Sequence, residues 1–154
     1  MTSWSVFEAA APELAGAGWA LLARDAEGDA DGDGLLATVR GDLAPRIHPV
    51  SVGLVGGKLC VFVLQSAKLR DLEQDGRYAL HTFVDPAAPD EFMIRGRVRR
   101  LEGADREVAA AGWSFTVDDT YVAFELEIQS AVLGRRKADE WPPSYTTWVG
   151  SSTP

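Results

Sequence analysis

A Ser–x–Lys sequence at 66–68 combines residue types and a position that suit anion binding. Ser66 stands where an apolar strand pattern ends, and it precedes a predicted helix over 67–74. Free N–H groups at a helix N-terminus, a serine hydroxyl and the Lys68 ammonium together favour a phosphate group. The stretch 36–72 therefore predicts a phosphate-binding site.

Arg46 and His48 lie on a predicted strand over 45–55 and, being two residues apart, point to the same face. Gly56-Gly57 is typical of a hairpin turn, so a strand over 58–64 should return beside the first. Arg46 could then add a bidentate phosphate contact to the same site. Spacing alone slightly favours another interpretation, in which Arg46 is a surface cation and Ser66 only caps the helix.

The remaining patterns predict a single domain, residues 1–154, that is mainly β. A Ser5–x–x–Glu8 capping box should begin an N-terminal helix that Pro12 interrupts. We expect the acidic loop over 24–34 to be solvated and the aromatic segment over 134–154 to pack on the domain or on a partner. Short turns between roughly six strands favour a small antiparallel β-barrel with accessory helices. Further strands are expected over 35–39, 77–84, 91–101 and 121–132, and a helix over 104–111. In the last of these strands, Glu125 and Glu127 are expected on the solvent-exposed face.

Composition excludes several functional classes. The net charge of -8 argues against a partner that is nucleic acid or an anionic membrane surface. Cys60 is the only cysteine, which excludes an intramolecular disulfide and a cysteine-based zinc site; its apolar surroundings predict a buried, inert thiol. The chain has no signal-peptide pattern and no apolar run of about 20 residues. We therefore expect a cytoplasmic protein.

We predict no metal site. Asp29, Asp31 and Asp33, followed by Gly34, match the first half of a calcium-binding loop, but Arg40 stands where the final bidentate glutamate is required. An acidic loop without bound calcium is therefore the favoured interpretation. A histidine metal site needs more ligands than His48 and His81 can offer, unless carboxylates join them.

The chain resembles the pyridoxamine 5′-phosphate oxidase-like family, the FMN-binding split β-barrels, and its N-terminus resembles the actinobacterial branch. The resemblance extends over nearly the whole chain in the same order. It is carried by FEAAAPELAGAGWALL (7–22), LATVRGDLAPRIHPV (36–50), SAKLRDLEQDGRYALH (66–81) and DEFMIRGRVRRLEG (90–103). It implies a split β-barrel, an FMN cofactor and a homodimer with the cofactor site at the subunit interface.

The resemblance also implies roles for individual residues. The strand with Arg46, His48, Pro49 and Val50 would line the flavin ring and contribute to phosphate binding. The backbone of Val63, Leu64 and Gln65 would run beside the flavin, and Ser66 and Lys68 would hold the FMN phosphate. Glu91 takes the position, often glutamine, that contacts FMN from the second subunit; an ionised carboxylate accepts a hydrogen bond there but cannot donate one.

These implications favour a flavin-dependent oxidoreductase that acts on a small-molecule substrate near Trp148 or His81. Vitamin B6 oxidation is not expected, because neither His48 nor His81 belongs to the C-terminal Arg–x–His motif of true pyridoxamine phosphate oxidases. Two alternatives remain open. One is a reductase that uses the deazaflavin F420 on the same fold, although the net charge of -8 does not favour its polyanionic tail. The other is a protein that binds a cofactor or haem without turnover.

Overall fold

The computed structural model describes residues 1–24 and 31–151. The helices are α1 (Trp4–Ala10), α2 (Pro12–Leu22), α3 (Ala67–Gln74) and α4 (Gly103–Ala111). The strands are β1 (Asp31–Val39), β2 (Pro45–Val55), β3 (Lys58–Val63), β4 (Arg77–His81), β5 (Glu91–Leu101), β6 (Val122–Arg135) and β7 (Ser144–Val149).

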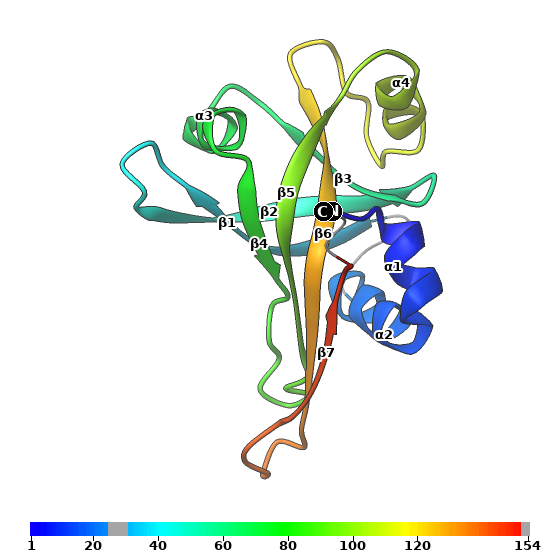
Figure 1. The fold of residues 1–154 in the computed structure, drawn as a ribbon, viewed down its shortest axis with the longest axis vertical. Helices are drawn as coiled ribbons and strands as arrows, with labels where there is room; N and C mark the ends of the chain where they lie inside the picture. Colours follow the sequence, from blue (N-terminus) through cyan, green and yellow to red (C-terminus); the bar gives the residue numbers. More distant parts are fainter. Residues whose placement is uncertain (25–30, 152–154) are drawn as a thin grey trace.

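The strands form one antiparallel sheet that closes into a barrel (Figure 1). They follow the order β3-β2-β1-β4-β5-β6, and an additional pairing between β3 and β6 completes the ring. Strand β6 is long enough to pair with two strands on one edge: Val122–Glu125 pair with β3, and Ser130–Arg135 pair with β7. The prediction of a mainly β barrel with accessory helices is therefore confirmed.

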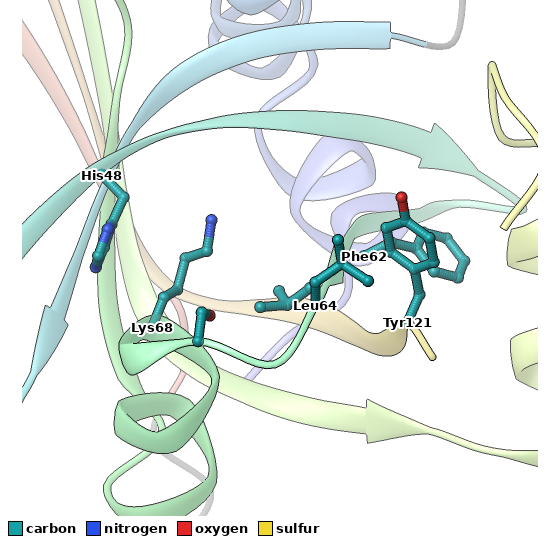
Figure 2. A pocket seen from close by; sticks show the side chains of 7 residues that line it. His48, Phe62, Leu64, Lys68 and Tyr121 are labelled. Atoms are coloured by element: carbon teal, nitrogen blue, oxygen red, sulfur yellow. The ribbon is translucent and has the colours of Figure 1, made fainter. Parts of the chain in front are cut away.

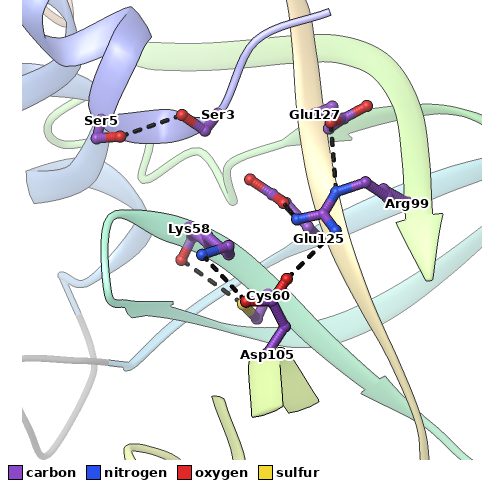
Figure 3. Close-up of polar contacts among 8 residues, drawn as sticks. All are labelled: Ser3, Ser5, Lys58, Cys60, Arg99, Asp105, Glu125 and Glu127. Atoms are coloured by element: carbon purple, nitrogen blue, oxygen red, sulfur yellow. Dashed lines mark hydrogen bonds and ion pairs between the residues drawn. The ribbon is translucent and has the colours of Figure 1, made fainter. Parts of the chain in front are cut away.

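Helices α1 and α2 pack on the barrel and contribute large aromatic side chains to its core (Figure 1). Trp4 and Phe7 are completely buried and meet edge to face, with ring centroids 5.3 Å apart. Pro12 opens α2, as predicted, because proline suits the first turn of a helix. The predicted capping box is wrong: α1 begins at Trp4 after an N-cap at Ser3, and the Ser5 hydroxyl contacts that of Ser3 (Figure 3).

The predicted acidic loop is wrong for its last four residues, since β1 already begins at Asp31 and pairs with β2 there. Gly32 and Gly34 explain how a segment without large apolar residues enters the sheet. Both are buried, and a Cβ on Gly32 would lie 2.9 Å from the Leu22 carbonyl oxygen. Close backbone packing therefore replaces side-chain burial here. Residues 25–30 of the predicted loop lie outside the described part of the chain.

The aromatic C-terminal segment packs on its own chain through a strand that the sequence did not indicate. Strand β7 extends the sheet along β6, and the Trp148 ring lies 4.9 Å from that of Phe7. Trp141, which precedes β7, is 79% exposed. The predicted ends of two strands also move: β4 ends at His81, and β6 continues to Arg135.

A polar cluster under α4 contradicts the expected exposure of Glu125. Its side chain is buried and accepts a hydrogen bond from Arg99, whose guanidinium also lies within ion-pair distance of Asp105 and Glu127 (Figure 3). An arginine of the neighbouring strand thus supplies the countercharge that lets a glutamate enter the interior.

Cys60 lies beside this cluster and is fully buried, as predicted. Burial, followed by the nearby charge of Glu125, raises the pKa of its thiol to about 12. The thiol is therefore protonated and unreactive at neutral pH. In residues 1–24 and 31–151, no helix has the length and apolar character needed to cross a membrane.

Candidate functional site

Helix α3 begins as the sequence predicted, and its cap leaves donors available. Ser66 is extended, with φ -165° and ψ 172°, and its Oγ accepts a hydrogen bond from the Leu69 N–H at 3.2 Å. Because the hydroxyl oxygen is the acceptor, its own hydrogen remains free to be donated to a ligand. The first backbone N–H groups of the helix also have no intrahelical acceptor. The N-terminus of α3 therefore presents several donors to one point.

A pocket of about 280 Å³ opens at this helix N-terminus (Figure 2). Strand β2 contributes to it, together with the end of β3, the start of α3 and the residue before β6. Figure 2 shows His48 and Lys68 at one side and the rings of Phe62 and Tyr121 at the other. The pocket thus has a cationic end and an aromatic end. Its lining residues are His48, Phe62, Val63, Leu64, Ser66, Lys68 and Tyr121.

Lys68 is half-buried in the wall of this pocket. Burial lowers the pKa of its ammonium group. Within residues 1–24 and 31–151, no carboxylate lies within 4.0 Å of it, although the chain has 23 acidic residues against 15 basic ones. A partly desolvated cation without a countercharge favours an anionic ligand.

His48 faces the pocket beside Lys68. Burial, then the charges of Lys68 and Arg46, lower the pKa of its imidazole, and the carboxylate of Asp71 opposes them. Its Nε2 atom is buried and has no hydrogen-bond partner in the described part of the chain. The neutral ring is therefore the favoured form near neutral pH.

Arg46 lies on the same face of β2 as His48, as predicted, but a carboxylate already holds it. Its Nε donates to Oδ2 of Asp71 at 2.8 Å, and the Thr38 hydroxyl donates to the same oxygen at 2.8 Å. Burial alone would raise the pKa of Asp71, but these two hydrogen bonds and the charge of Arg46 lower it. Asp71 is therefore ionised at neutral pH.

The structure brings five of the ten predicted site residues together in the pocket lining: His48, Val63, Leu64, Ser66 and Lys68. Of the other five, Arg46 pairs with Asp71, Val50 packs against the core, and Pro49 and Gln65 are exposed. Glu91 lies elsewhere on this chain, with its Oε2 3.5 Å from Nε2 of His81.

Two pocket residues, Phe62 and Tyr121, were missed by the sequence reasoning. Phe62 could have been found, because it is two residues before Leu64 on the same strand pattern. Tyr121 depends on the barrel closure, in which Val63 pairs with Val122 and so brings the preceding tyrosine beside Leu64. No local pattern indicates that pairing. The proposed substrate contacts His81 and Trp148 do not line this pocket.

Each of the four arginines of β5 contacts another side chain or a backbone carbonyl of the described chain. Arg99 and Arg100 pair with carboxylates, the latter with Glu73 and Glu102. Arg97 donates to the Asp75 carbonyl oxygen and Arg95 to the Ser130 hydroxyl. Carboxylates therefore balance the charges of Arg99 and Arg100.

No protein-family model and no curated protein matches this chain. Solved structures do resemble it. A haem-binding protein from Mycobacterium smegmatis superposes with a TM-score of 0.61 at 21% identity, over 85% of this chain and 57% of that one. This chain therefore spans little more than half of that protein's length.

Two further structures match this chain over most of their own length. PhzG from Burkholderia lata 383, in complex with tetrahydrophenazine-1-carboxylic acid, matches with a TM-score of 0.58 at 15% identity, over 96% of this chain and 93% of its own. HutZ, the haem storage protein from Vibrio cholerae, matches with a TM-score of 0.53 at 15% identity, over 76% and 84%. At these identities the likeness establishes the fold. The predicted split β-barrel is thereby confirmed.

Proposed function

We propose that this protein binds FMN and works as a flavin-dependent oxidoreductase. The observation that carries the proposal is the half-buried ammonium of Lys68, which has no carboxylate partner among the described residues, beside the Ser66 hydroxyl at the α3 N-terminus. Charge-assisted hydrogen bonds from these groups suit a phosphate, and the donated N–H groups of a helix N-terminus strengthen the same site. Arg46 would contribute further donors to the phosphate through the two terminal nitrogens of its guanidinium, because its bond to Asp71 uses Nε.

The other end of the pocket suits the ring system of the same ligand. Phe62, Leu64 and Tyr121 offer apolar and aromatic surface, on which a flat heterocycle packs favourably. A bound flavin supplies hydride or electron transfer, which no side chain of this pocket supplies. The chain's own residues bind the phosphate, orient the ring and exclude water from one of its faces.

We also propose that the protein is a homodimer in which a second copy covers the pocket. Leu64 lines the pocket and is nevertheless 47% exposed. Ile47 lies on the face of β2 opposite to His48 and is 65% exposed. Exposed apolar side chains at a ligand pocket and on the outer face of a neighbouring strand suit a surface that a partner covers. Sedimentation equilibrium checks this proposal: we expect a dimer for the natural sequence and a monomer for Ile47→Asp. A natural protein that is monomeric at micromolar concentration would contradict it.

The cofactor proposal is tested by titrating the purified, cofactor-stripped protein with FMN and with riboflavin, which lacks only the phosphate. We expect quenching of flavin fluorescence on binding and an FMN affinity at least about tenfold higher than that for riboflavin. Absence of FMN binding, or equal affinities, would overturn the proposal. For the oxidoreductase part, anaerobic addition of NADH, NADPH or reduced F420 should bleach the visible band of the bound flavin.

Haem binding is the second candidate, favoured by His48, an imidazole that lines the pocket and tends to be neutral. Two of the similar structures are described as haem proteins. We rank haem second because Nε2 of His48 is buried, so iron would reach it only after the ring turns. Titration with haemin separates the two: a Soret shift that His48→Ala abolishes, without FMN binding, would favour haem.

A further inference from the structure

Asp71 is a buried carboxylate beside the proposed phosphate site. It lies on α3, three residues after Lys68, and is only 4% exposed. Hydrogen bonds from Thr38 and Arg46 reach the same oxygen, Oδ2, each at 2.8 Å. A buried charge of this kind is costly unless it is paired, and two donors pair it here.

The two donors come from neighbouring strands at one level of the sheet. Thr38 of β1 and Arg46 of β2 are directly opposite each other in the antiparallel register. Asp71 therefore ties the first turns of α3 to both strands below it. Because His48 is two residues from Arg46 on β2, the Asp71–Arg46 pair sits beside the pocket that His48 lines.

We propose that Asp71 is a positioning residue for the phosphate: it fixes the Arg46 guanidinium through Nε, so that both terminal nitrogens remain available to the ligand. An arginine has many rotamers, and ordering it before binding removes that entropic cost from the binding step. The inference rests on the proposed FMN site and concerns the phosphate end only.

When the carboxylate of Asp71 is removed, a positioning role and a purely electrostatic role predict opposite changes in the affinity for FMN. If Asp71 acted only through its negative charge, its removal would strengthen the binding of an anion, because like charges repel. If it positions Arg46, its removal weakens phosphate binding, because the guanidinium becomes free to leave the site. A purely structural role would weaken FMN and riboflavin binding alike.

The experiment measures the dissociation constants of FMN and riboflavin for Asp71→Asn. We expect the FMN constant to rise by about tenfold or more while that of riboflavin changes less than about twofold. Asp75→Asn is the matched control: it makes the same charge change at the end of the same helix, where Asp75 pairs with the exposed Arg77. This control should leave both constants unchanged.

Two further variants keep the test decisive if Asp71→Asn does not fold. Thr38→Val removes one hydrogen bond and keeps the charge, and it should raise the FMN constant by a smaller factor than Asp71→Asn. In the Arg46→Met background, either change should have no further effect on FMN, because the positioned group is already missing. Unchanged or tighter FMN binding in both Asp71→Asn and Thr38→Val, or equal losses for FMN and riboflavin, overturns the inference. A natural protein that binds no FMN overturns the proposed function instead.

Discussion

His48 and Lys68 line one pocket from different elements, and burial together with the Lys68 ammonium lowers the pKa of the His48 imidazole. Strand β2 supplies the first residue and the N-terminal turn of α3 the second. Two potential cations thus face the same space, and only one of them is charged near neutral pH. The pocket therefore holds a charged ammonium beside a neutral imidazole.

The lowered pKa of His48 makes folding stability depend on pH. Since the folded pKa lies below the ordinary value of 6.5, the unfolded chain binds more protons between the two values. Stability from this residue is complete above about pH 6.5 and is lost as the pH falls through the folded pKa. We expect His48→Gln to flatten the pH dependence of the unfolding free energy on the acid side, measured by urea denaturation. An unchanged slope would show that His48 does not titrate as inferred.

Lys68 should carry much of the preference for FMN over riboflavin. Lys68→Met removes a charge-assisted contact to the phosphate, so we expect FMN binding to weaken by about 1.5–3 kcal/mol and riboflavin binding to stay the same. Arg70→Met is the control, because it makes the same charge change on an exposed position of the same helix. Fluorescence titration measures both. Equal losses of FMN affinity in the two variants would show that Lys68 acts only through the overall charge of the protein.

Ser66 caps α3, and in the proposed site its hydroxyl would also donate a hydrogen bond to the ligand. Ser66→Ala should lower the unfolding free energy by about 1 kcal/mol and weaken FMN binding, because both tasks are lost. Ser66→Asp should retain the stability, since aspartate caps helices well, but abolish FMN binding through repulsion of the phosphate. Thermal denaturation and FMN titration of the two variants check this split. Retained FMN binding in Ser66→Asp would remove Ser66 from the site.

The parts of the fold that sequence predicted well have strong local signals. The bounds of β2 and α3 agree with the predicted ranges, because a Gly56-Gly57 turn and the Ser66 cap mark their ends. Gly56 and Gly57 both have positive φ, at 57° and 75°, which the hairpin requires. Of the five predicted residues that line the pocket, local signals indicated His48, Ser66 and Lys68, whereas the family resemblance alone implied the other two, Val63 and Leu64.

The parts that sequence missed depend on pairing between distant segments. Asp31–Gly34 joins the sheet only because β2 offers a partner, and β7 exists because the second half of β6 has a free edge. The pairing of Arg46 with Asp71 spans 25 positions of sequence and no motif marks it. Glu125 looked like a surface residue, since its burial depends on Arg99 of the adjacent strand.

The buried Glu125 makes Arg99 important for stability. Arg99→Met should destabilise the protein by about 2–3 kcal/mol, because it leaves the buried carboxylate of Glu125 without its countercharge. This loss is smaller than that expected for a fully buried pair, because Arg99 itself is partly exposed. The double variant Arg99→Met/Glu125→Leu should be more stable than Arg99→Met alone, since no unpaired charge remains. Urea denaturation of the natural protein, the single variants Arg99→Met and Glu125→Leu, and the double variant gives the comparison. Strictly additive losses would contradict a coupled pair.

Gly96 should be the least replaceable glycine of the barrel wall. The register between β5 and β6 shifts between Arg95 and Gly96, and a Cβ at Gly96 would overlap the carbonyl oxygen of Glu127. Because backbone atoms cannot turn aside as a side chain can, we expect Gly96→Ala to cost more than about 3 kcal/mol. Gly16→Ala is the matched control. Gly16 is an exposed residue inside α2, and a methyl group added there would meet nothing within 4 Å, so alanine should add about 0.5–1 kcal/mol of stability. Thermal denaturation of both variants measures the change in stability. A Gly96→Ala protein as stable as the natural one would show that β5 and β6 can separate locally at little cost.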